Sequence, residues 1–161
     1  MSKILVPHPD CCTGCGLCEL MCSMAHTESS DPARSRIRIL KREEQGFFLQ
    51  TVCRQCEDAA CIAACPVSAI HRNAETRAIE IDGEACVLCE ECVAACPFGG
   101  IHLDETDQKI IACDLCGGDP KCAEFCETKA IEYLEKDPAA IQGNPDSVRE
   151  FQELLKSLEN C

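Results

Sequence analysis

The sequence predicts a small, loop-rich α+β fold that is stabilised by metal. Three observations favour it. Eighteen of the 161 residues are cysteine, only five are phenylalanine and one is tyrosine, and none is tryptophan. Aromatic and branched side chains usually fill the core of a chain of this size. Bound metal must therefore supply part of the interior, and the metal-free chain is expected to be largely unfolded.

The predicted strands are short and lie between the cysteines. Residues 36–40 alternate as a half-buried strand and residues 47–52 form a second strand. The Glu-Glu-Gln-Gly run between them predicts a hairpin turn. Further short strands are expected at residues 77–81 and 109–112.

The amino-acid composition of the chain changes after Lys136. Residues 137–145 are rich in proline, glycine and asparagine and predict a linker. A helix is expected to follow, with Asn144 as its cap and Pro145 in its first turn. Two roles for this helix stay open, packing onto the core or docking against a partner subunit. Its apolar stripe comprises Val148, Phe151, Leu154, Leu155 and Leu158.

Sixteen of the cysteines fall into four quartets. Only Cys11 and Cys161 stand outside; Cys11 is out of register with its neighbours and Cys161 is expected to be a free thiol. The quartets are Cys12, Cys15, Cys18 and Cys22 (C-x2-C-x2-C-x3-C); Cys53, Cys56, Cys61 and Cys65 (C-x2-C-x4-C-x3-C-P); Cys86, Cys89, Cys92 and Cys96 (C-x2-C-x2-C-x3-C-P); and Cys113, Cys116, Cys122 and Cys126 (C-x2-C-x5-C-x3-C).

The third quartet matches the spacing that bacterial ferredoxins use for a [4Fe–4S] cluster. Three thiolates on a tight loop hold one cluster, and the fourth cysteine ligates the neighbouring one. We expect the fourth cysteine to open a short helix with the following proline in its first turn. Zinc fits less well, because it takes two separated C-x2-C pairs. No C-x-x-C is followed by histidine, which excludes covalent haem. Four quartets thus predict four [4Fe–4S] clusters.

Sequence linkage predicts how the quartets exchange their fourth cysteines. The second and third quartets both end in Cys-Pro and lie close together, so they form one inner module (51–106). The outer module then combines 1–30 with 107–135, a hairpin insert covers 31–50, and 136–161 holds the linker and helix. A linear pairing of first with second and third with fourth stays open. The nested pairing gives cluster 1 to Cys12, Cys15, Cys18 and Cys126; cluster 2 to Cys53, Cys56, Cys61 and Cys96; cluster 3 to Cys86, Cys89, Cys92 and Cys65; and cluster 4 to Cys113, Cys116, Cys122 and Cys22.

The net charge of the chain and the absence of several sequence motifs exclude other functional classes of protein. The net charge of −13 argues against nucleic acid and against an anionic membrane surface. No apolar run approaches the roughly 20 residues of a spanning helix. The start of the chain has no apolar signal core, so we expect a cytoplasmic protein with reduced thiols. No phosphate-binding glycine motif or catalytic pair is present. No catalytic role is expected for His8, His26, His71 or His102.

Over residues 3–134 the chain resembles the four-cluster electron-transfer subunits of the dimethyl sulfoxide reductase and formate dehydrogenase iron–sulfur subunit family. The specific parts are the four quartets in order and the runs CRQCEDAACIAACP (53–66), DPARSRIRI (31–39) and CDLCGGDPKC (113–122). The resemblance implies the nested pairing, a row of four clusters acting as a wire, and no catalysis by the chain itself.

Three differences from other members of this family narrow the type of subunit that the chain resembles. The membrane helix of respiratory formate dehydrogenase subunits is missing, the chain is shorter than most reductase subunits, and Glu127 replaces the usual proline after Cys126. The chain is most similar to the small polyferredoxin subunit of tungsten-dependent aldehyde oxidoreductases. This implies a tungsten- or molybdenum-containing catalytic partner and a flavin- or NAD-binding subunit. The alternatives are a formate dehydrogenase, carbon monoxide dehydrogenase or hydrogenase partner, a free diffusible polyferredoxin, and a cluster-assembly scaffold. Self-association into longer wires also stays open.

Overall fold

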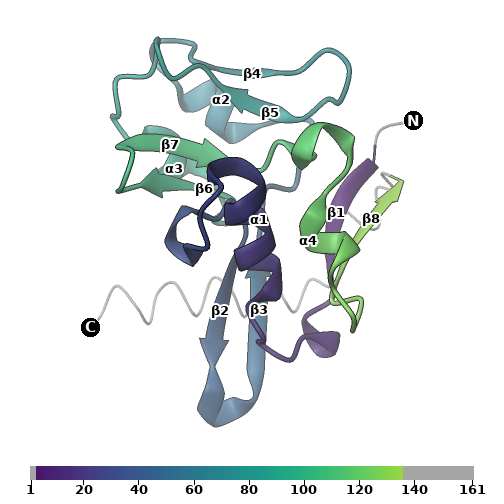
Figure 1. The fold of residues 1–161 in the computed structure, drawn as a ribbon. Helices are drawn as coiled ribbons and strands as arrows, with labels where there is room; N and C mark the ends of the chain where they lie inside the picture. Colours follow the sequence, from purple (N-terminus) through teal and green to yellow (C-terminus); the bar gives the residue numbers. More distant parts are fainter. Residues whose placement is uncertain (1–2, 136–161) are drawn as a thin grey trace.

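The computed structural model describes residues 3–135. The predicted linker and C-terminal helix lie outside the described residues, as does Cys161. Within them, the structure combines short helices with small antiparallel sheets, so the predicted α+β class is confirmed (Figure 1).

The described strands form four two-stranded antiparallel sheets. One of them joins the two ends of the described chain, because β1 (Lys3–Pro7) pairs with β8 (Ile131–Glu135). The other three are sequential hairpins. They pair β2 (Arg38–Arg42) with β3 (Phe47–Thr51), β4 (Ile70–Arg72) with β5 (Ile79–Ile81), and β6 (Ile101–Asp104) with β7 (Lys109–Ala112).

The helices are short. The longest, α1 (Leu17–Thr27), has 11 residues, and the others have four or five. Helices of this length are not stable alone in water and depend on packing or ligands. They are α2 (Ala60–Ala64), α3 (Glu91–Ala95) and α4 (Lys121–Glu124), and single 3-10 turns lie at η1 (Pro9–Cys11), η2 (Pro32–Arg34), η3 (Glu43–Gln45) and η4 (Leu115–Gly118).

The predicted strands are found with small shifts at their starts. The strand at 109–112 and the turn ending at Gly46 are confirmed. The strand expected at 36–40 starts two residues later, because the Arg36 N–H donates to the Cys22 sulfur instead of to a strand partner (3.3 Å). The strand expected at 77–81 starts at Ile79, since Arg77 adopts a left-handed turn conformation (φ +62°).

The expectation that the fourth cysteine of a quartet opens a helix is wrong. Helices α2 and α3 each contain the third cysteine of a quartet, Cys61 and Cys92, and the fourth cysteines Cys65 and Cys96 are their C-terminal caps. Pro66 and Pro97 follow in turns. A proline just after a helix is favoured because it cannot continue the helix. Cys22 differs from both, since it lies within α1.

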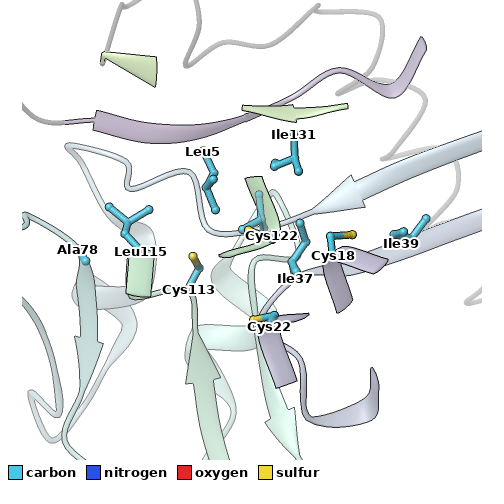
Figure 2. Packing of buried hydrophobic residues seen from close by; sticks show 11 residues of the cluster. Leu5, Cys18, Cys22, Ile37, Ile39, Ala78, Cys113, Leu115, Cys122 and Ile131 are labelled. Atoms are coloured by element: carbon cyan, nitrogen blue, oxygen red, sulfur yellow. The ribbon is translucent and has the colours of Figure 1, made fainter. Parts of the chain in front are cut away.

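Elements far apart in sequence pack together in a nested order. Helix α1 packs against α4, and α2 packs against α3 (Figure 1). The interior divides into two apolar clusters, and Cys53 contacts both. The first lies beneath the β1–β8 pair, where Figure 2 shows cysteine sulfurs among aliphatic side chains. The second lies between the β4–β5 and β6–β7 hairpins and includes Ile70, Ile79, Ile101 and Ile110.

Candidate metal centres

Four of the predicted ligands line one cavity. Its volume is about 240 Å³, and its lining includes Cys12, Cys15, Cys18 and Cys126. Cys12 and Cys15 come from the loop before α1, Cys18 from the first turn of α1, and Cys126 from the turn after α4, more than a hundred residues later. Other parts of the wall are apolar, with Leu17, Ile39, Phe125 and Ile131 among the lining residues.

Gly14 shapes the loop that carries Cys12 and Cys15 and leads into α1 with Cys18. Its φ is +69°, in the left-handed region that favours glycine. A Cβ at this position would lie 2.5 Å from the ring of Phe48. The Gly14 N–H also donates to the Cys12 sulfur at 3.4 Å. The β2–β3 hairpin therefore packs directly against this loop.

A second group forms around His26, four residues after Cys22 on α1. The ring lies between two sulfurs, with Nδ1 3.8 Å from the Cys22 Sγ and Nε2 4.0 Å from the Cys116 Sγ. Cys113 and Cys122 are buried in the same apolar cluster as Cys22 (Figure 2). Burial raises the pKa of Cys122, and the neighbouring charges of Cys22 and Cys116 raise it further.

The His26 ring is held by a charged network. Its Nε2 lies 3.0 Å from Asp114 Oδ1, and Asp114 also pairs with the Arg36 guanidinium. The hydrogen bond to Asp114, followed by those to Cys116 and Cys22, raises the pKa of His26 to about 12. The sequence predicts no role in a site for His26, yet the structure places it beside two of the predicted ligands. Its spacing is the one available signal, because residues four apart share one helix face.

A third group surrounds the second quartet. Burial raises the pKa of Cys53 to about 12, and the charges of Cys96 and Cys61 add to the effect. The loop after Cys96 lies directly on the backbone of Cys53, since a Cβ on Gly100 would come 2.5 Å from the Cys53 nitrogen. Cys96 thus lies close in space to the second quartet, although it is distant from it in sequence.

The remaining predicted ligands are Cys65 and the third quartet. Cys65, Cys86 and Cys92 pack in one apolar cluster, which also includes Cys53, Cys61 and Cys96 of the third group. Burial raises the pKa of Cys92 to about 11. At Cys65 burial also opposes ionisation, but N–H groups of the following turn outweigh it and lower the pKa. One of these donors is Ala69, 3.3 Å from the sulfur.

The residues present fit iron–sulfur clusters. Each group gathers thiol sulfurs in a largely apolar setting, and soft sulfur donors suit iron–sulfur chemistry. Burial makes thiols such as Cys18 and Cys53 hard to ionise in the metal-free chain. Bound metal compensates by stabilising the thiolate, so that loading releases protons. Cys15 and Cys89 are exposed, and Cys11 is exposed in η1.

Among residues 3–135, no helix is long and apolar enough to cross a membrane.

Known proteins with similar sequences include several subunits of oxidoreductases. The chain is 40% identical over 127 residues to the polyferredoxin-like subunit of an aliphatic sulfonate oxidoreductase from Pyrococcus furiosus, covering 79% of this chain and 73% of that one. It is 38% identical to the beta subunit of an NADH-dependent phenylglyoxylate dehydrogenase from Aromatoleum evansii, covering 78% of this chain and 29% of the relative. The B subunit of the anaerobic dimethyl sulfoxide reductase of Escherichia coli is 32% identical, with 76% and 68% covered.

One solved structure supports the fold. A chain of the BamBC active site complex of benzoyl coenzyme A reductase superposes with a TM-score of 0.50 at 21% identity, covering 97% of this chain and 88% of that chain. The resemblance inferred from the cysteine motifs is confirmed by the relatives and by a family model. That model describes a 4Fe-4S dicluster domain and matches residues 44–136. The chain belongs to the 4Fe-4S dicluster domain family.

Proposed function

We propose that this chain is a non-catalytic electron-transfer subunit that holds four [4Fe–4S] clusters for a catalytic oxidoreductase subunit. One observation carries the proposal: Cys126 shares a cavity with Cys12, Cys15 and Cys18, although it belongs to the last quartet. Exchange of the fourth cysteine between two quartets is the ligation pattern of two-cluster ferredoxins. Membership of the dicluster family and the oxidoreductase subunits among the relatives support it.

The nested pairing is the proposed ligand assignment. Contacts of α1 with α4 and of α2 with α3 support an outer and an inner module. Cluster 1 takes Cys126, cluster 2 takes Cys96, cluster 3 takes Cys65 and cluster 4 takes Cys22, each added to three cysteines of the partner quartet. The closeness of Cys22 to Cys116 and Cys122 supports cluster 4, and that of Cys96 to Cys53 and Cys61 supports cluster 2.

The chain's own residues would hold the clusters, shield them from water and tune their reduction potentials. Each [4Fe–4S] cluster supplies reversible one-electron chemistry when bound. Cysteine sulfurs would bind the iron, and aliphatic residues such as Leu5, Ile79 and Ile131 exclude water. Backbone N–H groups of Gly14, Arg36 and Ala69 donate to cysteine sulfurs and favour their charged form.

Double substitutions test the ligand assignment. Two alanines within one cluster should remove one cluster, whereas two alanines in different clusters should remove two. The nested pairing predicts that Cys22→Ala with Cys113→Ala loses about four irons per chain. The linear pairing predicts a loss of about eight. Cys53→Ala with Cys113→Ala is the matched control, because both pairings place these residues in different clusters.

The proposed partner is a tungsten- or molybdenum-containing catalytic subunit, with a tungsten aldehyde oxidoreductase as the first candidate. The relative that is a polyferredoxin-like subunit of a sulfonate oxidoreductase supports a catalytic oxidoreductase partner. We also propose a flavin- or NAD-binding subunit, and the NADH-dependent relative supports the NAD-binding form. We also propose a cytoplasmic location.

Elemental analysis of the complex, purified anaerobically from its native host, tests the partner. Tungsten or molybdenum with about sixteen irons per chain would support the proposal. Nickel would indicate a hydrogenase or carbon monoxide dehydrogenase. Iron alone on a monomer would favour a diffusible polyferredoxin, and zinc with little iron would refute the assignment. Rapid cluster transfer to an apo-acceptor would favour the assembly scaffold.

A further inference from the structure

The side chain of Gln50 is an unpaired amide in the interior. Gln50 lies on β3 and is only 3% exposed. Neither its Nε2 nor its Oε1 has a hydrogen-bond partner among the residues that the structure describes. Buried polar side chains are nearly always hydrogen-bonded, because an unmade bond leaves the full desolvation penalty. This amide therefore needs a partner that residues 3–135 do not supply.

Gln50 lines the cavity that Cys12, Cys15, Cys18 and Cys126 share. Alternate residues of a strand point to the same face, so Gln50 lies on the face of β3 that carries Phe48. The Phe48 ring lies against Gly14, in the loop that bears Cys12 and Cys15 and leads into α1 with Cys18. Ile39, the register partner of Gln50 on β2, lines the same cavity. The hairpin thus presents one polar group to this cysteine site.

We propose that the Gln50 side-chain amide donates a hydrogen bond from Nε2 to a sulfur of cluster 1. The inference rests on the proposed function, since it requires a cluster in this cavity. Sulfur is the expected partner because thiolates and cluster sulfides are negatively charged and accept N–H donors. The cysteine sulfurs elsewhere in the chain already do so, as at Cys22 and Cys65.

The hydrogen bond has a defined consequence for the reduction potential. Adding an electron makes the cluster more negative, so a donor to its sulfur stabilises the reduced form more than the oxidised form. Gln50 would therefore raise the potential of cluster 1. It would act as a tuning residue and not as an iron ligand.

Two variants remove the donor while keeping the length of the side chain. Gln50→Met replaces the amide by an apolar group, and Gln50→Glu replaces it by a carboxylate that also adds negative charge. Gln45→Met is the matched control, since Gln45 lies exposed in the turn of the same hairpin. Each full-length chain is purified anaerobically, its iron is counted, and its clusters are titrated reductively while EPR signals are recorded.

With iron unchanged, Gln50→Met should lower the reduced-to-oxidised ratio of one cluster about tenfold at fixed potential, which is about 59 mV for one electron. Gln50→Glu should lower it further, and Gln45→Met should change nothing. Full iron with all potentials unchanged in both Gln50 variants would overturn the inference. A wild-type chain with far fewer than sixteen irons would count against the proposed function instead.

A second measurement decides the case in which the variants lose iron. Wild-type chain is labelled with ¹⁵N in its glutamine side-chain amides, and pulsed EPR is recorded on the reduced protein. A nitrogen coupling to a cluster is expected from Gln50. Gln55 does not line this cavity, and its Nε2 donates to the Cys113 carbonyl oxygen at 2.7 Å. The absence of any such coupling would refute the hydrogen bond.

Discussion

Replacing Gly100 by alanine should cost the protein one cluster. Gly100 lies directly against the backbone that leads into the second quartet. An alanine Cβ would lie 2.5 Å from the Cys53 nitrogen, 2.6 Å from the Cys53 Cα and 2.6 Å from the Val52 carbonyl carbon. All three atoms belong to the main chain, so no flexible side chain can turn aside to relieve the contact.

The size of the effect follows from these distances. They are roughly 0.8 Å below the 3.4 Å at which ordinary contact begins, so the segments carrying Cys53 and Cys96 must separate by about that amount. Metal–ligand distances tolerate changes of about 0.2 Å. Overpacking of this kind costs about 1–3 kcal/mol before the loss of the metal is counted. The φ of Gly100 is not left-handed, so conformational strain does not add to the effect.

Iron analysis of the anaerobically purified chain is the assay. Gly100→Ala should retain about twelve irons per chain where the wild type holds about sixteen, and the missing EPR signal should belong to cluster 2. Gly83→Ala is the matched control, because a methyl group on Gly83 would have nothing within 4 Å and this glycine has no left-handed φ. Full iron and unchanged thermal stability in Gly100→Ala would refute the proposed meeting of Cys53 and Cys96 at one cluster.

Three further predictions concern pH, charge and metal. Burial, aided by the charge of Arg38, lowers the pKa of His102 to about 4, so the unfolded chain binds a proton first as the pH falls. The free energy of unfolding should therefore be roughly 2 kcal/mol lower at pH 5 than at pH 7. Guanidinium unfolding at the two pH values should show a smaller decrease in His102→Gln. Arg54 is 9% exposed, no described carboxylate pairs with it, and the thiolates of Cys53 and Cys56 are the charges that act on it. Arg54→Met should lower one reduction potential by about 59 mV or more in an EPR-monitored titration, and an unchanged potential would show that the guanidinium does not sense the cluster. Anaerobic removal of iron should abolish most far-UV circular dichroism, because three of the four described helices have five residues or fewer; a native-like spectrum of the metal-free chain would contradict a metal-stabilised fold.

Local spacing predicted the parts of the molecule that depend on neighbours in sequence. The pattern of polar and apolar residues located four of the eight described strands, β2, β3, β5 and β7, to within two residues. The shifted start of β2 shows what this reasoning lacks, because the Arg36 N–H bonds to a sulfur of α1 and not to a strand. The position of the short helices was also predicted wrongly, since proline after Cys65 and Cys96 can follow a helix as well as begin one.

Long-range contacts of residues outside the cysteine motifs could not be predicted from the sequence. His26 shows no recognisable motif, yet the fold brings it to Asp114 and to two cysteine sulfurs. In the sequence Gln50 looks like an ordinary hairpin residue, but in the structure it is buried and lines a cavity that cysteines also line. Both depend on which elements pack together, and a single sequence does not contain that information in local form. The residues that tune a site are therefore harder to predict than its ligands.

Coulometric titration of the full-length chain, purified anaerobically with its iron, tests the central claim most directly. A subunit with four [4Fe–4S] clusters should take up four electrons per chain reversibly and return to the same oxidised spectrum through repeated cycles. Uptake of only two electrons, or a spectrum that decays as clusters are lost during cycling, would contradict a four-cluster electron-transfer subunit.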